Sequence, residues 1–280
     1  MWLLKLLSRL PLWVLYGFSA FLFFVSYRLV KYRRKLVHKN LSASFPDKSL
    51  AELATIERDF YRNLCDYAVE TLKLLSISRE QLAARMAYTN PELMGKYTNQ
   101  GQTVLLLSSH HFNWEWLLVS GSISLPAPVD FVYQPVKNTF FNEVTQLART
   151  RFGAFPVKRN DIAREIIKRR DKVRGIAVVA DQYPGHGNDK KYFTRFLHQE
   201  TAFFYGSQQM AALTQAPVLY AVVRRIKRGY YTCTLVEVGN PPYSKTDESV
   251  VANYAKEVEK VIMERPSEWL WSHNRWKNKR

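Results

Sequence analysis

A short apolar run, Thr103–Leu107, is followed directly by the polar and aromatic stretch Ser108–Glu115, and this junction constrains the fold more than any other part of the chain. The run has the length and composition of a buried strand, and the apolar segment Trp116–Val119 can continue as a helix. In α/β proteins the carboxyl end of a strand is a common place for chemistry. His110 and Glu115 both lie at this predicted strand end, which makes it the first candidate for an active site.

The rest of the chain repeats this alternation of apolar strands and amphipathic helices. Further strands are predicted at residues 129–133, 155–157, 176–180, 192–196, 217–223 and 230–238. Helices are predicted at residues 53–74, 138–151, 161–169, 203–215 and 248–264. Ser49 and Glu52 form a capping pair at the start of the first helix. Interleaved strands and helices predict an α/β fold in which a mostly parallel sheet is covered by helices.

The charge balance of the chain is strongly basic. It has 41 lysines and arginines against 24 aspartates and glutamates, which gives a formal net charge of +17. Such an excess predicts an anionic partner: a nucleic acid, an anionic lipid or an acidic protein. The two cysteines, Cys65 and Cys233, lie far apart and form no ligand pattern, so neither a zinc site nor a disulfide framework is expected.

Residues 1–30 are dominated by apolar and aromatic side chains. The uncharged part, residues 10–27, is about 18 residues long, which is near the lower limit for crossing a bilayer. A basic cluster, Lys31–Lys35, follows at once, and by the positive-inside rule it stays on the cytoplasmic side. We therefore predict an N-terminal membrane anchor with the remainder of the chain in the cytoplasm.

Two other readings of this apolar segment stay open. Pro11 and the marginal length leave room for a helix that lies in the membrane interface, and a buried core helix is the third possibility. The domain organisation expected from the sequence has three parts. Residues 1–30 form the anchor, residues 31–100 a basic flank with helices packed on the core, and residues 101–280 the α/β catalytic core.

The histidine and glutamate at the predicted strand end indicate base catalysis. A neutral imidazole can accept a proton at physiological pH, because its unperturbed pKa is about 6.5. A carboxylate bonded to the other ring nitrogen fixes the tautomer. We predict that His110 is a general base oriented by Glu115, and His111 is the competing base. No activated serine or cysteine accompanies them, so direct attack by a substrate hydroxyl is expected.

The stretch Ser109–Glu115 resembles the His-x4-Glu signature of the lipid A biosynthesis lauroyl/myristoyl acyltransferases, within the larger lysophospholipid acyltransferase superfamily. The spacing and Asn113-Trp114-Glu115 are kept, whereas His111-Phe112 replaces the usual Phe-Gly pair. The resemblance extends through most of the chain. Further blocks follow in the family's order: Asn40-Leu41, Phe45-Pro46, Tyr133-Gln134-Pro135, Val157-Lys158-Arg159, Asp181-Gln182, Phe193–Phe196 and Trp269–Lys277.

This resemblance implies that a fatty acyl chain moves from an acyl carrier protein thioester to a hydroxyl of a lipid A precursor at the inner membrane, with no metal or other cofactor. Acyl carrier protein and an anionic membrane lipid acceptor are the expected partners, and both suit a basic protein. His110 would be the base and Glu115 its orienting carboxylate. Arg159 would stabilise the oxyanion, with the backbone amides after the motif as the alternative.

The same blocks imply substrate-binding roles for Asn113, Asp181, Gln182, Arg195 and Arg275. For Asp181 a structural hydrogen-bonding role is equally compatible with the sequence. A solvated surface position is at least as compatible for Arg195 and for Arg275, which would otherwise bind acceptor phosphates.

Gln134 stands where the family usually has arginine. It removes a charge that could bind phosphate, and it can signal a different acceptor headgroup. The alternatives are therefore an acyltransferase acting on another lipid, such as a lysophospholipid or aminolipid, and a non-catalytic membrane lipid-binding protein. Nucleic-acid binding is not expected, because the chain has no recognised nucleic-acid motif and begins with a membrane-like segment.

Overall fold

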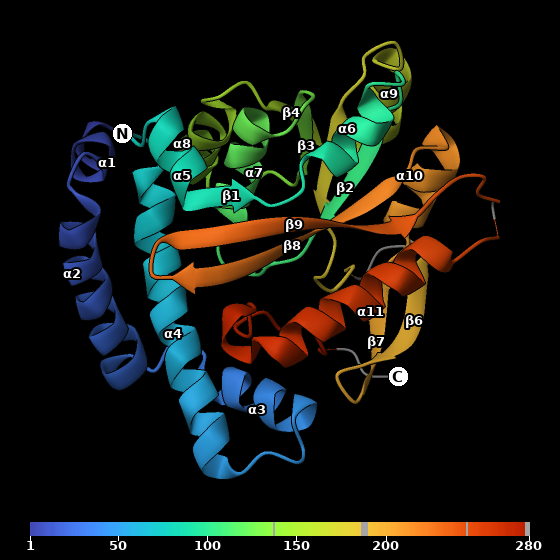
Figure 1. Cartoon of the computed structure of the whole chain (residues 1–280). Coiled ribbons are helices and arrows are strands. Elements are labelled where there is room, and N and C mark those ends of the chain that lie inside the picture. Colours follow the sequence, from blue (N-terminus) through green and yellow to red (C-terminus); the bar gives the residue numbers. More distant parts are fainter. Residues whose placement is uncertain (137, 186–189, 245, 278–280) are drawn as a thin grey trace.

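The computed structural model describes residues 1–136, 138–185, 190–244 and 246–277. Within these ranges a seven-stranded sheet with the order β1-β9-β8-β2-β5-β3-β4 forms the centre of the molecule (Figure 1). Its strands are β1 (Met86–Tyr88), β2 (Val104–Ser108), β3 (Val129–Tyr133), β4 (Phe155–Lys158), β5 (Gly175–Val179), β8 (Val218–Lys227) and β9 (Tyr230–Gly239). A separate two-stranded sheet contains β6 (Lys191–Phe196) and β7 (Gln199–Phe204).

The sheet is mostly parallel. β2 pairs in parallel with both β5 and β8, and β3 pairs in parallel with both β4 and β5. Only β8 and β9 are antiparallel, because they form a hairpin with Gly229 in the left-handed region at the turn. The predicted fold class, a mostly parallel sheet covered by helices, is confirmed.

Helices cover the sheet and extend beyond it. The shorter ones are α1 (Trp2–Ser8), α3 (Arg34–Ser44), α5 (Arg79–Arg85), α6 (Glu92–Thr98), α9 (Ile162–Lys168) and α10 (Gly206–Thr214). The longer ones are α2 (Leu12–Phe23), α4 (Leu50–Lys73), α7 (Trp114–Ser124), α8 (Thr139–Thr150) and α11 (Ser249–Glu264). Short turns of other helix types lie at η1 (Phe24–Leu29), η2 (Arg159–Asp161) and η3 (Pro266–Glu268). The predicted capping pair at the start of α4 is confirmed, since Ser49 and Glu52 bond each other's backbone amides.

The alternation of side chains along β2 divides the core in two. Leu105 and Leu107 belong to the cluster packed by α3, α10 and α11, whereas Val104 and Leu106 belong to the cluster packed by α5, α6 and α7. All five residues of β2 are buried. A central strand that is apolar on both faces is typical of a parallel sheet between two helical layers. The ends of such a strand are therefore the part that a ligand can reach.

Two strands were not predicted from the sequence. β1 has only three residues, too few for an alternation of polar and apolar side chains to show. The last two residues of β7 (Gln199–Phe204), Phe203 and Phe204, were assigned by the sequence to the start of a helix at 203–215. β7 pairs residue by residue with β6, and the helix begins later, at Gly206. Tertiary pairing therefore overrides the local helical signal there.

The N-terminal apolar region lies along one side of the molecule. Figure 1 shows α1 and α2 beside α4, away from the central sheet, and α2 contacts α4 along its length. Within the described chain, Leu12–Leu29 is the helical stretch of 18 residues whose length and composition would allow a bilayer crossing.

Candidate active site

Two neighbouring strands bring the central histidine to a carboxylate. β2 and β5 are parallel, and Ser108 at the end of β2 is paired with Val179 at the end of β5. Both chains continue by two residues to His110 and Asp181, which therefore arrive at the same edge of the sheet. The hydroxyl of Tyr254 on α11 donates to the carbonyl of Ser108 at 2.7 Å and fixes this edge to the helix below it.

His110 and Asp181 form a close hydrogen-bonded pair. Nδ1 of His110 lies 2.6 Å from Oδ1 of Asp181, and the backbone N–H of His110 donates to Oδ2 at 2.9 Å. The indole N–H of Trp269 donates to the same Oδ2 at 2.7 Å. Burial alone would raise the pKa of Asp181, but the adjoining His110 and these three hydrogen bonds outweigh it and hold the pKa well below its usual range. The carboxylate is therefore ionised and fixes the imidazole.

The opposite ring nitrogen of His110 faces a cleft. With Nδ1–H donated to Asp181, Nε2 carries the lone pair, and the side-chain amide of Gln182 donates to it at 3.0 Å. The ring of Trp114 packs against the imidazole with its centroid 5.0 Å away. A neutral histidine held in this tautomer can accept a proton from a hydroxyl that displaces the Gln182 amide.

The cleft beside His110 has a volume of about 940 Å³. Its basic side chains are Arg149 and Arg159, and none of its described lining residues is an aspartate or glutamate. Gln134 and Tyr133 line it at the end of β3, and Ile162, Ile166 and Met210 form apolar parts of its wall. The opening is therefore electropositive with an apolar wall, which suits a ligand that combines anionic and hydrocarbon groups.

The orienting carboxylate is not the one that the sequence predicted. Glu115 was expected to hold His110, and the structure places Asp181 in that position. Glu115 is the second residue of α7, and its side chain forms a two-pronged pair with Arg149 of α8. Nε of Arg149 lies 2.8 Å from Oε2, and Nη2 lies 2.5 Å from Oε1. Both oxygens of Glu115 are thus directed at α8 and not at the imidazole.

A narrow apolar cavity adjoins the cleft beneath α7. It is lined by side chains from α7 and from the strands under it, including Leu106, Leu117, Leu118, Gly121, Leu125, Val129, Phe131 and Leu235. Trp114 and Arg149 line both the cavity and the cleft. The Glu115–Arg149 pair therefore lies at the junction between the apolar cavity and the cleft that contains His110.

His111, the competing base, is enclosed by protein. Its side chain is 1% exposed, and Nδ1 lies 2.6 Å from the hydroxyl of Ser109, which in turn bonds the hydroxyl of Tyr220 at 2.7 Å. Burial lowers the pKa of His111 to about 4. A ring without access to the cleft cannot take a proton from a substrate, so His111 supports the loop and His110 is the candidate base.

Asn113, predicted to bind substrate, has a structural position instead. It is fully buried and caps α7, since its Oδ1 accepts the backbone N–H groups of Glu115 and Trp116 at 3.1 Å each. Its Nδ2 donates to Oε2 of Glu70 at 2.9 Å. Asparagine is a favoured cap because its short side chain reaches the free amides of the first turn. The Trp116 amide, the first after the motif and so among the alternative oxyanion donors that the sequence offered, is consequently engaged by this cap.

The predicted basic residues lie in three different settings. Arg159 lines the cleft, with its guanidinium 4.6 Å from the centroid of the Phe204 ring. Arg195 lies on the exposed side of β6 and is not among the residues that line the cleft. Arg275 is 1% exposed, donates to the carbonyl of Ala202 at 2.6 Å, and has its pKa lowered to about 10 by burial. Neither the acceptor-phosphate role nor the surface position expected for Arg275 agrees with this buried site.

Sequence reasoning missed Arg149 and Trp269 as parts of the site. Trp269 reaches Asp181 because its backbone pairs with that of His111 in an isolated antiparallel bridge. The Trp269–Lys277 block carried a family resemblance, which was the available signal. Arg149 lies within an ordinary amphipathic helix and gave none. Among the described residues, no cluster of three or more histidine, cysteine, aspartate or glutamate side chains could hold a metal ion.

The chain is similar to known proteins along nearly its whole length. A family model described as bacterial lipid A biosynthesis acyltransferase matches residues 1–278. The lipid A biosynthesis lauroyltransferase of Escherichia coli K12 is 25% identical over 278 residues, which cover 99% of this chain and 89% of that protein. The lipid A biosynthesis palmitoleoyltransferase of the same strain is 26% identical over 254 residues, or 89% of this chain and 80% of the relative. A lipid A biosynthesis acyltransferase of Shigella flexneri has the same identity and coverage.

Proposed function

Because this chain belongs to the bacterial lipid A biosynthesis acyltransferase family, it is an O-acyltransferase, and we propose that it moves a fatty acyl chain from an acyl carrier protein thioester to a hydroxyl of a lipid A precursor. The observation that carries the proposal is the position of His110, whose Nε2 faces the cleft while Asp181 holds Nδ1 at 2.6 Å. A base held in this way acts on a hydroxyl, and the family's description indicates a lipid A precursor as the molecule that carries it.

In the first step, Nε2 of His110 takes the proton of the acceptor hydroxyl as that oxygen attacks the thioester carbonyl carbon. The C–O bond forms, the carbonyl π electrons move onto oxygen, and His110 becomes an imidazolium. Asp181 stabilises this cation through the short hydrogen bond to Nδ1 and does not itself take the proton, because its pKa is held low. The buried hydrogen bonds from His110 and Trp269 keep the carboxylate in place.

In the second step, the tetrahedral intermediate collapses, the C–S bond breaks, and the imidazolium of His110 returns its proton to the leaving thiolate. Between the steps the oxyanion needs a cation or hydrogen-bond donors. We assign this role to the guanidinium groups that line the cleft, Arg149 and Arg159. Glu115 then acts by fixing Arg149 through the two-pronged pair. Glu115, the acidic residue of the His-x4-Glu motif, therefore positions the Arg149 guanidinium and does not contact His110.

The acyl chain is assigned to the apolar cavity beneath α7. A thioester whose carbonyl lies between His110 and Arg149 would have its hydrocarbon tail at the mouth of this cavity, because Trp114 and Arg149 line both spaces. Burying hydrocarbon there contributes about 0.8 kcal/mol for each methylene group removed from water. The cavity can therefore select chain length as well as bind the chain.

The charge of the molecule suits both proposed substrates. The net charge of +17 attracts an acidic carrier protein and an anionic lipid. Gln134 lines the cleft at the position where the family resemblance implies an arginine, so the headgroup meets a neutral side chain there. This difference favours, as the second candidate, a related acyltransferase whose acceptor carries a different headgroup.

Mass spectrometry of membrane lipids tests both candidates. Cells that express the wild-type chain are compared with cells that express His110→Ala to the same level, in a strain without its own late lipid A acyltransferases. The proposal predicts a lipid A precursor heavier by one acyl chain in the wild-type cells only. An added acyl chain on a glycerophospholipid or aminolipid would support the second candidate. Identical lipid masses in both strains would contradict both.

A further inference from the structure

The apolar segment at the N-terminus has one face that no other part of the described chain covers. On α2 and η1 the exposed side chains are large and apolar: Trp13, Phe18, Phe21, Leu22, Phe24 and Leu29. Trp13 is 77% exposed and Phe21 is 64% exposed, whereas Leu15, on the opposite face, is 1% exposed. A continuous patch of six large exposed apolar side chains, on a protein that acts on lipids, indicates contact with a membrane.

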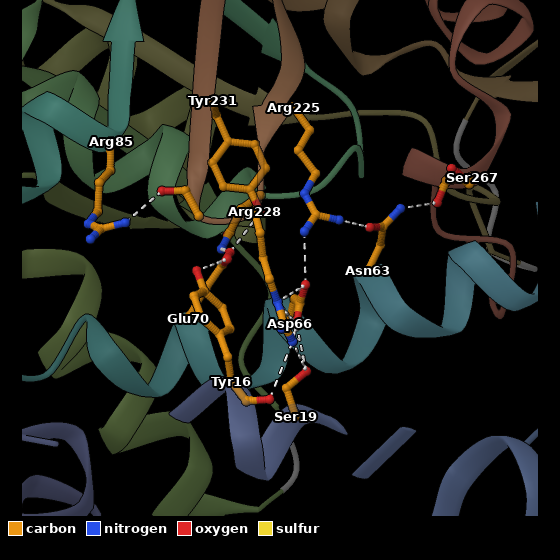
Figure 2. A network of polar contacts seen from close by, with 12 residues as sticks. Tyr16, Ser19, Asn63, Asp66, Glu70, Arg85, Arg225, Arg228, Tyr231 and Ser267 are labelled. Atoms are coloured by element: carbon orange, nitrogen blue, oxygen red, sulfur yellow. Dashed lines mark hydrogen bonds and ion pairs between the residues drawn. The ribbon is translucent and has the colours of Figure 1, made fainter. Parts of the chain in front are cut away.

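The opposite face of α2 is tied to α4 by polar side chains (Figure 2). The hydroxyl of Ser19 donates to Oδ1 of Asp66 at 2.6 Å, and the hydroxyl of Tyr16 donates to Oε1 of Glu70 at 2.9 Å. Arg228, at the end of the β8–β9 hairpin, also bonds Asp66 at 2.6 Å and the backbone carbonyl of Tyr16 at 3.3 Å. The helix is therefore joined to both α4 and the catalytic sheet.

Glu70 and Asp66 extend this network into the catalytic core. Oε2 of Glu70 accepts hydrogen bonds from the Tyr231 hydroxyl of β9 at 2.8 Å and from Nδ2 of Asn113, the cap of α7, at 2.9 Å. Nη2 of Arg225 on β8 lies 2.9 Å from Oδ2 of Asp66. Moving α2 away from α4 into hydrocarbon would leave the hydroxyls of Tyr16 and Ser19 without these acceptors, which costs about 1 to 3 kcal/mol for each such group.

Both ends of the apolar segment are also attached to α4. Before α2, Nζ of Lys73 donates to the carbonyls of Ser8 and Leu10 at 2.9 Å each. After η1, the hydroxyl of Tyr61 donates to the carbonyl of Tyr32. Lys73 and Tyr61 are twelve residues apart on the same helix, about 18 Å along its axis. The apolar segment thus runs along α4 and cannot leave it at either end.

A bilayer crossing by α2 would take this part of α4 into the hydrocarbon. Arg62 lies there with its side chain 55% exposed, and Arg58 and Asp59, with side chains 44% and 40% exposed, lie on the turn just before it. Each arginine at the bilayer centre costs about 2.5 to 3.5 kcal/mol on insertion scales. The segment is also short, since 18 helical residues extend about 27 Å against a hydrocarbon core of about 30 Å.

Exposed basic residues flank the apolar face on both sides. Lys5 and Arg9 precede α2, and Arg28 and Lys31 follow it. A crossing helix would place Lys5 and Arg9 on the side of the membrane opposite to the basic cluster Lys31–Lys35, whereas the positive-inside rule favours keeping basic residues on one side. If the helix lies flat, all four reach the anionic headgroups of a single leaflet.

We propose that α1, α2 and η1 lie in the plane of the cytoplasmic leaflet, with the outer face of α2 among the acyl chains of an anionic bilayer and its inner face fixed on the catalytic domain, so that the chain does not cross the membrane. The lipid surface is the single occupant of this apolar face. The proposal concerns how the catalytic domain is attached to the membrane, and its test does not depend on acyl transfer.

Cysteine accessibility decides between a flat helix and a crossing helix. The native Cys65 and Cys233 are buried, so single exposed cysteines can be introduced as Lys5→Cys, before α2, and Lys35→Cys, after η1. Spheroplasts with an intact inner membrane are treated with a membrane-impermeant maleimide, and inverted inner-membrane vesicles receive the same treatment. A co-expressed protein with a periplasmic cysteine verifies that the reagent reaches the outer side.

The flat arrangement predicts no labelling of either variant in spheroplasts and labelling of both in inverted vesicles. Labelling of Lys5→Cys from the outside, or recovery of the wild-type protein in the soluble fraction, would overturn the proposal.

A second pair of variants tests the apolar face itself. Trp13→Ser/Phe21→Ser is predicted to lower the membrane-bound fraction at least tenfold. Leu50→Ser/Met263→Ser, which removes exposed apolar side chains elsewhere, leaves the fraction unchanged. Full retention of the first pair would contradict the account.

Discussion

Nδ1 of His110 lies 2.6 Å from Oδ1 of Asp181, although the two residues are 71 positions apart in the chain. The parallel pairing of β2 and β5 creates this contact, and the indole of Trp269 completes it from the other side of the carboxylate. The general base of the proposed reaction is therefore oriented by a residue from a neighbouring strand. Glu115, five residues further along the same loop and helix, orients Arg149 instead.

Substitution of Asp181 by asparagine tests this assignment. The amide cannot accept the Nδ1–H hydrogen bond as a carboxylate does and cannot stabilise the imidazolium. We expect kcat to fall by about 10³- to 10⁴-fold, as in other enzymes whose histidine loses an orienting carboxylate. Turnover is measured with an acyl carrier protein donor and a lipid A precursor, and circular dichroism checks that the variant is folded. Asp171→Asn, at an exposed position, is the matched control. A folded Asp181→Asn enzyme with near-normal kcat would contradict the role.

The pair formed by Glu115 and Arg149 can be tested by a double-mutant cycle. Either single variant, Glu115→Leu or Arg149→Met, leaves a partly or fully buried charge without its partner and is expected to cost about 3 to 5 kcal/mol of stability. The double variant removes both charges and should regain most of that stability. Its turnover should stay low, because the cleft lacks the Arg149 guanidinium. Thermal unfolding and kcat are measured for all four proteins, and wild-type turnover in the double variant would refute the catalytic assignment.

Chain-length selection by the apolar cavity is testable at Gly121. A methyl group built on its Cα would lie 3.3 Å from the Tyr88 hydroxyl and 3.5 Å from Cδ1 of Leu125, so a larger side chain fills that part of the cavity. Gly121→Val is expected to shift preference toward shorter acyl donors, by about fourfold in kcat/KM for each methylene that no longer fits. Competition between donors of different length measures the shift, and Gly121→Ala should give a smaller one. An unchanged preference would show that the chain lies elsewhere.

The buried ring of His111 predicts a pH dependence of stability. Its pKa is lowered by burial to about 4, against about 6.5 in an unfolded chain. Between these values the unfolded state binds a proton that the folded state does not, so stability falls as the pH falls from about 6.5 to about 4. The loss is on the order of 3 kcal/mol for a fully buried ring. His111→Phe should reduce the slope measured by urea unfolding over this range, and His273, whose pKa is also lowered to about 4 by burial, accounts for the slope that remains. An identical slope in His111→Phe would refute the prediction.

The sequence predicted where individual strands end, but it did not predict which strand ends lie next to each other in the sheet. The apolar runs before His110 and Asp181 identified both residues as candidates, because strand ends are recognisable locally. The order of β2 and β5 in the sheet depends on contacts between distant segments, so the partner of His110 could not be read from the chain. Proximity in sequence favoured Glu115. One turn of α7 directs that side chain toward α8 instead.

The surroundings of the basic residues and of the N-terminal helix also depend on contacts between distant segments. Arg195 and Arg275 had the same expected roles from the sequence, but Arg195 is exposed on β6 and Arg275 is buried beside Phe203. On the apolar segment, Tyr16 and Ser19 are the polar residues spaced three apart on the face that contacts α4. This spacing was visible in the sequence, yet its partners Glu70 and Asp66 became apparent only when α2 and α4 were placed side by side. Burial is a property of the assembled layers and not of residue type.

The most direct test of the central claim is the turnover of purified His110→Ala enzyme with an acyl carrier protein thioester and a lipid A precursor, followed by mass spectrometry of the acceptor. The wild-type protein is predicted to add one acyl chain to the precursor and to release the carrier thiol. His110→Ala should bind both substrates, remain folded, and lose at least 10³-fold in kcat, because the acceptor hydroxyl keeps its proton. Near-normal turnover in a folded His110→Ala enzyme would contradict the account.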